Sequence, residues 1–160
     1  MRLIAHWRPT MTNLATLLPQ VLPVAISWAD DQERLALSTG AALTQQGIAD
    51  ARTVGVLEPE KIRVVIVPTL PLPADAWLRN VAVGAGLLGP GFTGLTLGYA
   101  IFIVHGHLTR RLLTHECRHV HQYEAAGSIA AFLPEYLQQI ATVGYDAAPF
   151  EVDARAHEIH

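Results

Sequence analysis

One group of residues in this sequence has the types and spacing needed for chemistry. His115, Glu116 and His119 form the pattern H-E-x-x-H. Residues four positions apart lie on the same face of an α-helix, so the two imidazoles can point at one ion. Zinc accepts such ligands and lowers the pKa of a water that it holds to about 7. The pattern therefore predicts a zinc (Zn²⁺) site in which Glu116, next to the first histidine, acts as the general base.

The residues around this pattern favour a helix. Leu108, Leu112 and Tyr123 continue the face of the two histidines at intervals of three or four positions. Thr109 lies where the chain would enter the helix, and Gly127 lies where it would leave. The alternative is a surface helix in an interaction protein, with incidental histidines. Metal analysis of the protein separates the two interpretations.

A catalytic zinc site needs a third protein ligand. The metzincin pattern would place Gly at position 122 and His at position 125, where this chain has Gln122 and Ala125. The other common ligand is a glutamate on a later helix. Glu151 follows Pro149, which suits the first turn of a helix. We therefore expect Glu151 to complete the site.

Three other acids compete for this role. Glu124 lies five residues after His119 on the same predicted helix and cannot turn back to the same ion. Glu135 lies on the next predicted helix and remains an alternative to Glu151, as does Glu158 near the end of the sequence.

H-E-x-x-H followed downstream by E-x-x-A, which begins at Glu151, resembles the gluzincin class of zinc metallopeptidases. Residues 98–104 resemble the strand that borders the substrate cleft in that class. The resemblance implies that His115, His119 and Glu151 bind the metal and that Glu116 is the catalytic base. It also implies a zincin-like fold and a peptide or protein substrate.

The resemblance covers residues 96–158 and has one departure from the pattern. Many gluzincins carry an aspartate four residues after the glutamate ligand, where it hydrogen-bonds a ligand histidine, and this chain has Arg155 there. The groups that orient the imidazoles are therefore expected elsewhere, at Asp153 or at a backbone carbonyl. Tyr145 precedes the third ligand and could donate a hydrogen bond to an oxyanion, or serve as an ordinary core residue.

The remaining elements are predicted from hydrophobic patterns and turn residues. We expect an extended or partly helical arm over residues 1–31, a helix over 31–51, a strand over 62–67, a loop over 84–94 that leads into a strand over 95–104, and a helix after Ser128 that ends at Gly144. Together they predict one α+β domain over residues 1–160, with a small mixed or antiparallel sheet packed on the active-site helix, further C-terminal helices, and an arm of unclear role over residues 1–30.

Composition excludes some classes of function. A net charge of -3 and a single lysine argue against a nucleic-acid surface. Residues 81–104 carry no charge and are long enough to cross a bilayer, but Gly89, Pro90 and Gly91 interrupt them, so a membrane span is not expected. The single cysteine, Cys117, favours a reducing compartment, so we expect a cytoplasmic protein, with secretion or membrane association as alternatives.

These patterns together predict a zinc-dependent hydrolase, specifically a metallopeptidase. The alternative is a small domain that uses zinc to hold helices together without catalysis, or that serves as an interaction module. A coordination position open to water distinguishes the enzyme from this alternative. The sequence leaves the oligomeric state open.

Overall fold

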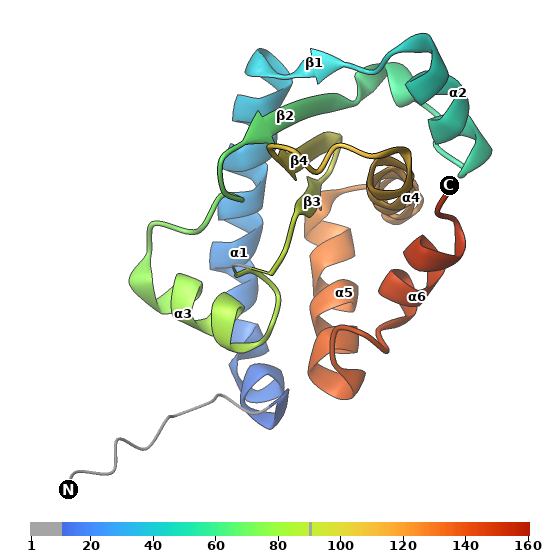
Figure 1. The fold of residues 1–160 in the computed structure, drawn as a ribbon. Helices are drawn as coiled ribbons and strands as arrows, with labels where there is room; N and C mark the ends of the chain where they lie inside the picture. Colours follow the sequence, from blue (N-terminus) through green and yellow to red (C-terminus); the bar gives the residue numbers. More distant parts are fainter. Residues whose placement is uncertain (1–10, 90) are drawn as a thin grey trace, which may run out of the picture.

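The structure, a computed structural model, describes residues 11–89 and 91–160 and has a mixed α+β architecture (Figure 1). Of these residues 60% are helical and 11% lie in strands, which confirms the predicted α+β class. The elements are α1 (Met11–Thr39), β1 (Ala41–Ala42), α2 (Gln45–Thr53), the 3₁₀ helix η1 (Pro59–Lys61), β2 (Arg63–Val67), α3 (Ala76–Gly84), β3 (Gly94–Leu97), β4 (Ala100–Val104), α4 (Arg110–Ala126), α5 (Ile129–Val143) and α6 (Pro149–Ala156).

The sheet lies between helices, with β4 as its buried strand and β1 exposed. Its strand order is β1-β2-β4-β3, with β2 and β4 parallel and the other two pairs antiparallel. Alternate residues of β4 point to opposite faces: Ala100 and Phe102 join a core with α1 and α5, whereas Ile101 and Ile103 join a core with α2 and α4. Burial on both faces explains why β4 is uniformly apolar.

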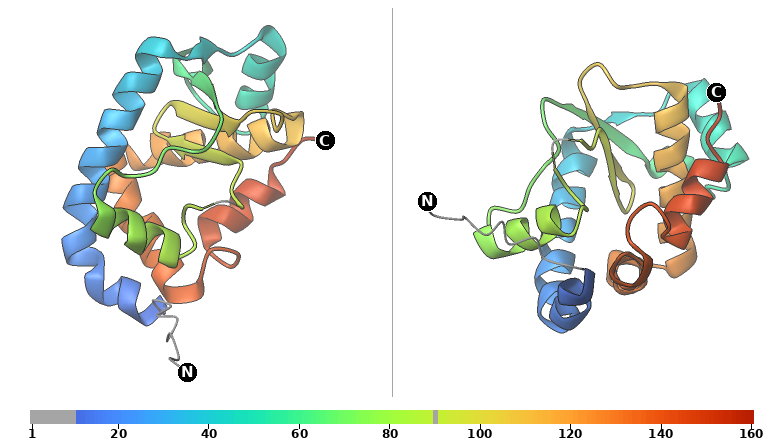
Figure 2. Two further views of the ribbon diagram at one scale, coloured as in Figure 1. Left: turned by 60° about the vertical axis from the view of Figure 1, so that its left-hand side comes forward. Right: turned by 60° about the horizontal axis from the view of Figure 1, so that its bottom comes forward.

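The N-terminal region differs from the prediction. From Met11 onward it is a continuous helix, α1, that runs along one side of the molecule (Figures 1 and 2). The segment predicted as an extended or partly helical arm is helical from residue 11 and packs on α3 and α5, and its first ten residues lie outside the described part of the chain. Pro19 and Pro23 lie inside α1, although a proline in a helix interior costs about 3 kcal/mol. The packing of Leu14, Leu18 and Val21 against the α3 and α5 side chains offsets this cost.

The predicted helix over residues 31–51 is two helices with a break between them. α1 ends at Thr39, and a Cβ at Gly40 would lie 2.8 Å from both the Ala36 carbonyl oxygen and the Arg63 Cβ. The chain pairs there with β2 as β1, and α2 then begins after Thr44, whose hydroxyl accepts a hydrogen bond from the Gly47 amide.

The predicted strand over residues 95–104 is a hairpin. β3 and β4 are antiparallel partners, and the chain reverses at Gly98, which has a φ of 63°. A Cβ at Gly98 would lie 1.7 Å from a carboxylate oxygen of Glu33 in α1, so only glycine fits this turn. The sequence analysis also missed α3, which precedes the predicted loop.

The other predicted elements are confirmed. β2 occupies residues 63–67 of the predicted strand over 62–67. The Ser128 hydroxyl caps α5, which ends before Gly144. Among the described residues, no helix combines the length and the apolar composition needed to cross a bilayer.

Candidate metal centre

α4 presents the H-E-x-x-H residues to the interior. The helix begins after Thr109, whose hydroxyl accepts a hydrogen bond from the Leu112 amide at 3.1 Å, and it ends at Gly127, which has a φ of 98°. His115, Glu116 and His119 are only 8%, 4% and 7% exposed. Polar side chains buried to this extent need partners, because an unpaired polar group in the interior is costly.

α6 brings Glu151 to the two histidines. Pro149 occupies the first position of this helix, and the Gln139 side chain in α5 accepts a hydrogen bond from the Phe150 amide at 2.9 Å. Gln139 thus replaces the missing cap of Ala148, whose side chain cannot accept a hydrogen bond. Glu151 lies in the first turn of α6, where a carboxylate is favoured by the helix dipole, and it is 2% exposed.

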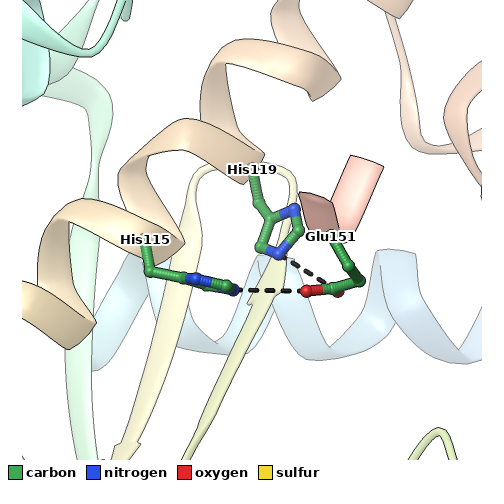
Figure 3. A group of neighbouring side chains, drawn as sticks. All are labelled: His115, His119 and Glu151. Carbon is green, nitrogen blue, oxygen red and sulfur yellow. Dashed lines mark ion pairs between the residues drawn. The ribbon is translucent and has the colours of Figure 1, made fainter. Parts of the chain in front are cut away.

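The three predicted ligand side chains converge (Figure 3). His115 Nε2 lies 3.3 Å from Glu151 Oε2, and His119 Nε2 lies 3.2 Å from Glu151 Oε1. One ligand atom from each residue lies within 4.8 Å of those of the other two. Tetrahedral zinc with bonds of about 2.0 to 2.2 Å separates neighbouring ligand atoms by about 3.3 to 3.6 Å, and the two nitrogen-to-oxygen separations of 3.3 and 3.2 Å are close to this range.

The orientation of the His119 ring is fixed by Gln122. The Gln122 amide nitrogen donates to the Phe150 carbonyl and to Asp153 Oδ2, both at 2.9 Å. Its carbonyl oxygen therefore faces His119 Nδ1, at 2.8 Å, and must accept a hydrogen bond from the Nδ1–H. In the neutral imidazole this leaves the lone pair of Nε2 directed at Glu151.

The His115 ring is held in the same way by Glu158. Its Nδ1 lies 2.9 Å from Glu158 Oε1, and Arg111 lies 3.6 Å from the other carboxylate oxygen. The neighbouring Ile159 amide donates to the Thr114 hydroxyl at 2.9 Å, which ties this segment to α4. In the neutral imidazole, the Nε2 lone pair of His115 is also directed at Glu151.

These contacts correct the prediction that Asp153 or a backbone carbonyl orients the histidines. Asp153 acts indirectly, because it binds Gln122 and Arg118 rather than His115 or His119. Gln122 lies three residues after His119 on the same helix, so their contact could have been predicted from the spacing in the sequence. Glu158 appeared in the sequence analysis only as a rival ligand, since nothing in the sequence pairs it with His115.

With neutral imidazoles, the Nε2 lone pairs of both histidines face the Glu151 carboxylate, so the centre needs a positive charge between them. Glu151 Oε2 is buried, and although His115 Nε2 lies 3.3 Å away, no described residue makes a well-aligned hydrogen bond to this oxygen. Burial disfavours charged imidazoles, but hydrogen bonding with Glu151 and its charge raise the pKa of His119 to about 9 and also raise that of His115. Burial likewise opposes the Glu151 carboxylate, yet the two imidazoles hold its pKa well below the ordinary value. Either protons on the imidazoles or one divalent cation can supply the charge, so the residues fit zinc.

Glu116 lies beside this triad with its carboxylate against β3. The Thr96 hydroxyl donates to Glu116 Oε2 at 2.6 Å. A Cβ at Gly94 would lie 2.5 Å from Glu116 Oε1, so glycine at this position makes room for the carboxylate. Sequence analysis did not identify Thr96 or Gly94, because their proximity depends on how β3 packs on α4.

Two tyrosines approach the centre from the other side. The Tyr136 hydroxyl in α5 donates to Glu151 Oε1 at 2.8 Å, a contact that the sequence analysis missed. Tyr145 lines the same cavity as Glu116 and Glu151, with its ring 5.1 Å from that of Phe92. Burial raises the pKa of both phenols far above the ordinary value, so both remain neutral donors.

The rival acids do not join the group. Glu124 accepts hydrogen bonds from the Leu57 and Glu58 amides and from the Tyr99 hydroxyl, away from the metal centre. Glu135 is exposed on α5.

Comparisons with models of protein families, with curated proteins and with solved structures found no match to this chain.

Proposed function

We propose that this protein is a zinc-dependent hydrolase of the gluzincin type, and specifically a metallopeptidase. The observation that carries the proposal is the convergence of His115, His119 and Glu151, with both imidazole Nε2 atoms directed at one carboxylate. Zinc in this group would polarise a carbonyl and activate a water. A ligand set of two histidines and one glutamate is typical of catalytic zinc, which keeps a fourth position open.

Glu116 is the proposed general base. It lies next to His115 and lines the cavity, and the Thr96 hydroxyl holds one of its oxygens. The carboxylate would take a proton from the water and pass it to the leaving amine. Tyr145 lines the same cavity and is the candidate donor to the oxyanion.

β3 is the proposed binding strand for the substrate backbone. It is the last strand of the sheet, next to β4, and its first two residues, Gly94 and Leu95, are partly exposed, so an extended peptide could pair with its outer edge there. At Thr96 the carbonyl already accepts a hydrogen bond from the Tyr123 hydroxyl. Thr96 in β3 contacts Glu116, and a peptide on this edge would therefore have its backbone beside the base.

The first experiment separates turnover from metal binding. Protein purified without a histidine tag is assayed for zinc content and for hydrolysis of a broad peptide library, as wild type and as Glu116→Gln. We expect about one zinc per chain in both, and a loss of at least about 100-fold in hydrolysis for the variant. Glu151→Gln should lose the zinc.

Glu135→Gln is the matched control, because it makes the same chemical change at an exposed carboxylate and should alter neither property. Full activity in Glu116→Gln would refute its role as base. A wild type that binds zinc but cleaves no peptide would instead support the non-catalytic zinc domain.

A further inference from the structure

An apolar cavity extends from the metal centre into the N-terminal half of the protein. At one end it is lined by Glu116, His119 and Glu151. Beyond them the wall is formed mainly by side chains of α1, α3 and α5, among them Leu14, Val21, Trp28, Leu78, Val81 and Leu137. The residues of α1 and α3 lie outside the region that resembles gluzincins, so this cavity is a feature of this chain.

The cavity has the size of one large side chain. Its volume is about 120 Å³. For comparison, a cavity of about 150 Å³ lined by leucine, isoleucine and phenylalanine stays dry and binds benzene. A leucine, methionine or phenylalanine side chain is of this size, whereas an alanine would leave most of the space empty.

The chemistry of the lining excludes charged occupants. None of the described residues around the cavity is Lys, Arg or Asp, and its two carboxylates, Glu116 and Glu151, both lie at the metal end. Beyond the metal end, a charged group of either sign would be desolvated without a partner. Only an apolar group is stabilised by burial along the whole cavity.

We propose that the cavity is a specificity pocket for a large apolar side chain next to the hydrolysed bond of a peptide. This inference rests on the proposed function. The cavity shares Glu116, His119 and Glu151 with the candidate metal centre, so a carbonyl at the metal has its neighbouring side chain at the mouth of the cavity. Leucine, methionine and phenylalanine are the side chains selected.

The test uses the zinc-loaded wild type and peptides that differ only on one side of the cleaved bond. One peptide series varies the residue before the cleaved bond and another varies the residue after it. In one of the two series, we expect kcat/KM for Leu or Phe to exceed that for Ala, Asp or Lys by at least about tenfold. Ala25→Phe adds a ring from α1 into the cavity and should remove most of this preference. Ala82→Leu, from α3, is a second filling variant that serves if the first does not fold.

Val24→Phe is the matched control, because Val24 is the neighbour of Ala25 on the same helix but is 41% exposed. It should keep the preference for large apolar side chains. An equal loss in this control, or a wild type that cleaves all the peptides equally well, would overturn the proposed pocket while leaving the peptidase proposal intact.

A binding measurement separates the pocket from the peptidase activity. Two short hydroxamates, one with a benzyl and one with a carboxymethyl side chain, are titrated into zinc-loaded protein by calorimetry. Preference for the benzyl compound by at least about tenfold, lost in Ala25→Phe, supports the pocket even if no peptide is cleaved. Equal binding of the two compounds, or no binding of either, would overturn the pocket.

Discussion

The imidazoles of the candidate metal centre are each fixed at Nδ1 by a separate acceptor. Gln122 holds His119 from within α4, and Glu158 holds His115 from the segment after α6. An acceptor at Nδ1 sets the tautomer, directs the Nε2 lone pair and increases its basicity. For the proposed zinc site, we therefore expect the affinity to depend on side chains that do not touch the metal.

Removing the acceptor of His115 tests this dependence. Glu158→Ala should weaken zinc binding by about 10- to 100-fold, because the ring loses the group that directs its lone pair at Glu151. Competition with a fluorescent chelator measures the change. The control, Glu135→Ala, removes an exposed carboxylate from α5 and should keep the wild-type affinity. An unchanged affinity in Glu158→Ala would show that Glu158 does not support the site.

At the scale of elements, α4 packs on the sheet and binds the neighbouring helices α2 and α6. One side of it packs on β4 and α2, and its polar groups bind neighbouring elements through ion pairs. Arg110 binds both carboxylate oxygens of Asp50 in α2 at 2.9 Å, and Arg118 binds Asp153 in α6 at 2.8 Å. These bidentate pairs fix the elements that flank the site.

The Asp50 pair predicts a pH-dependent stability. The Arg110 hydrogen bond holds the pKa of Asp50 below its ordinary value of 3.8, so the stabilisation is present above that pH and is lost as the pH falls through the lower folded-state value. Asp50→Asn should lower the thermal midpoint at pH 7, with a smaller difference from wild type near pH 3. Asp31→Asn, in an exposed pair with Arg34, is the control and should have little effect at either pH.

Elements whose ends are set by neighbouring residues in the sequence were predicted correctly. α4 and α5 begin at Thr109 and Ser128, whose side chains cap them, and glycines follow both helices. The prediction failed where tertiary packing decides. α1 continues through Pro19 and Pro23 because its apolar face is buried. The chain turns at Gly98, where the Glu33 carboxylate leaves no room for a Cβ. Thr96 reaches Glu116 only through the packing of β3 on α4, which no local pattern encodes.

At the scale of the whole molecule, the candidate ligands join two helices that are far apart in sequence. His115 and His119 lie on α4 and Glu151 lies on α6, with the whole of α5 between them. A metal bound in common restrains these helices in the folded chain and not in the unfolded one, so its binding free energy adds to stability.

Zinc should therefore raise the thermal midpoint. At a free concentration of about 100 times the dissociation constant, the gain in unfolding free energy is about 2.7 kcal/mol. For a chain of this size it corresponds to an increase of about 5 to 10 °C. Differential scanning calorimetry with zinc and after chelation measures it, and Glu151→Gln should show no such increase. Equal midpoints of the wild type in both conditions would contradict a shared metal site.

The candidate metal centre and the far wall of the cavity come from different parts of the chain. The proposed ligands, the proposed base and the side chains described as contacting them lie from Gly94 onward, whereas α1 and α3 precede it and supply much of the apolar wall. If the protein is the hydrolase proposed, substitutions in the first half of the chain would alter which molecules are accepted while the reacting groups stay in place. Selectivity could then diverge among related chains without loss of the reaction.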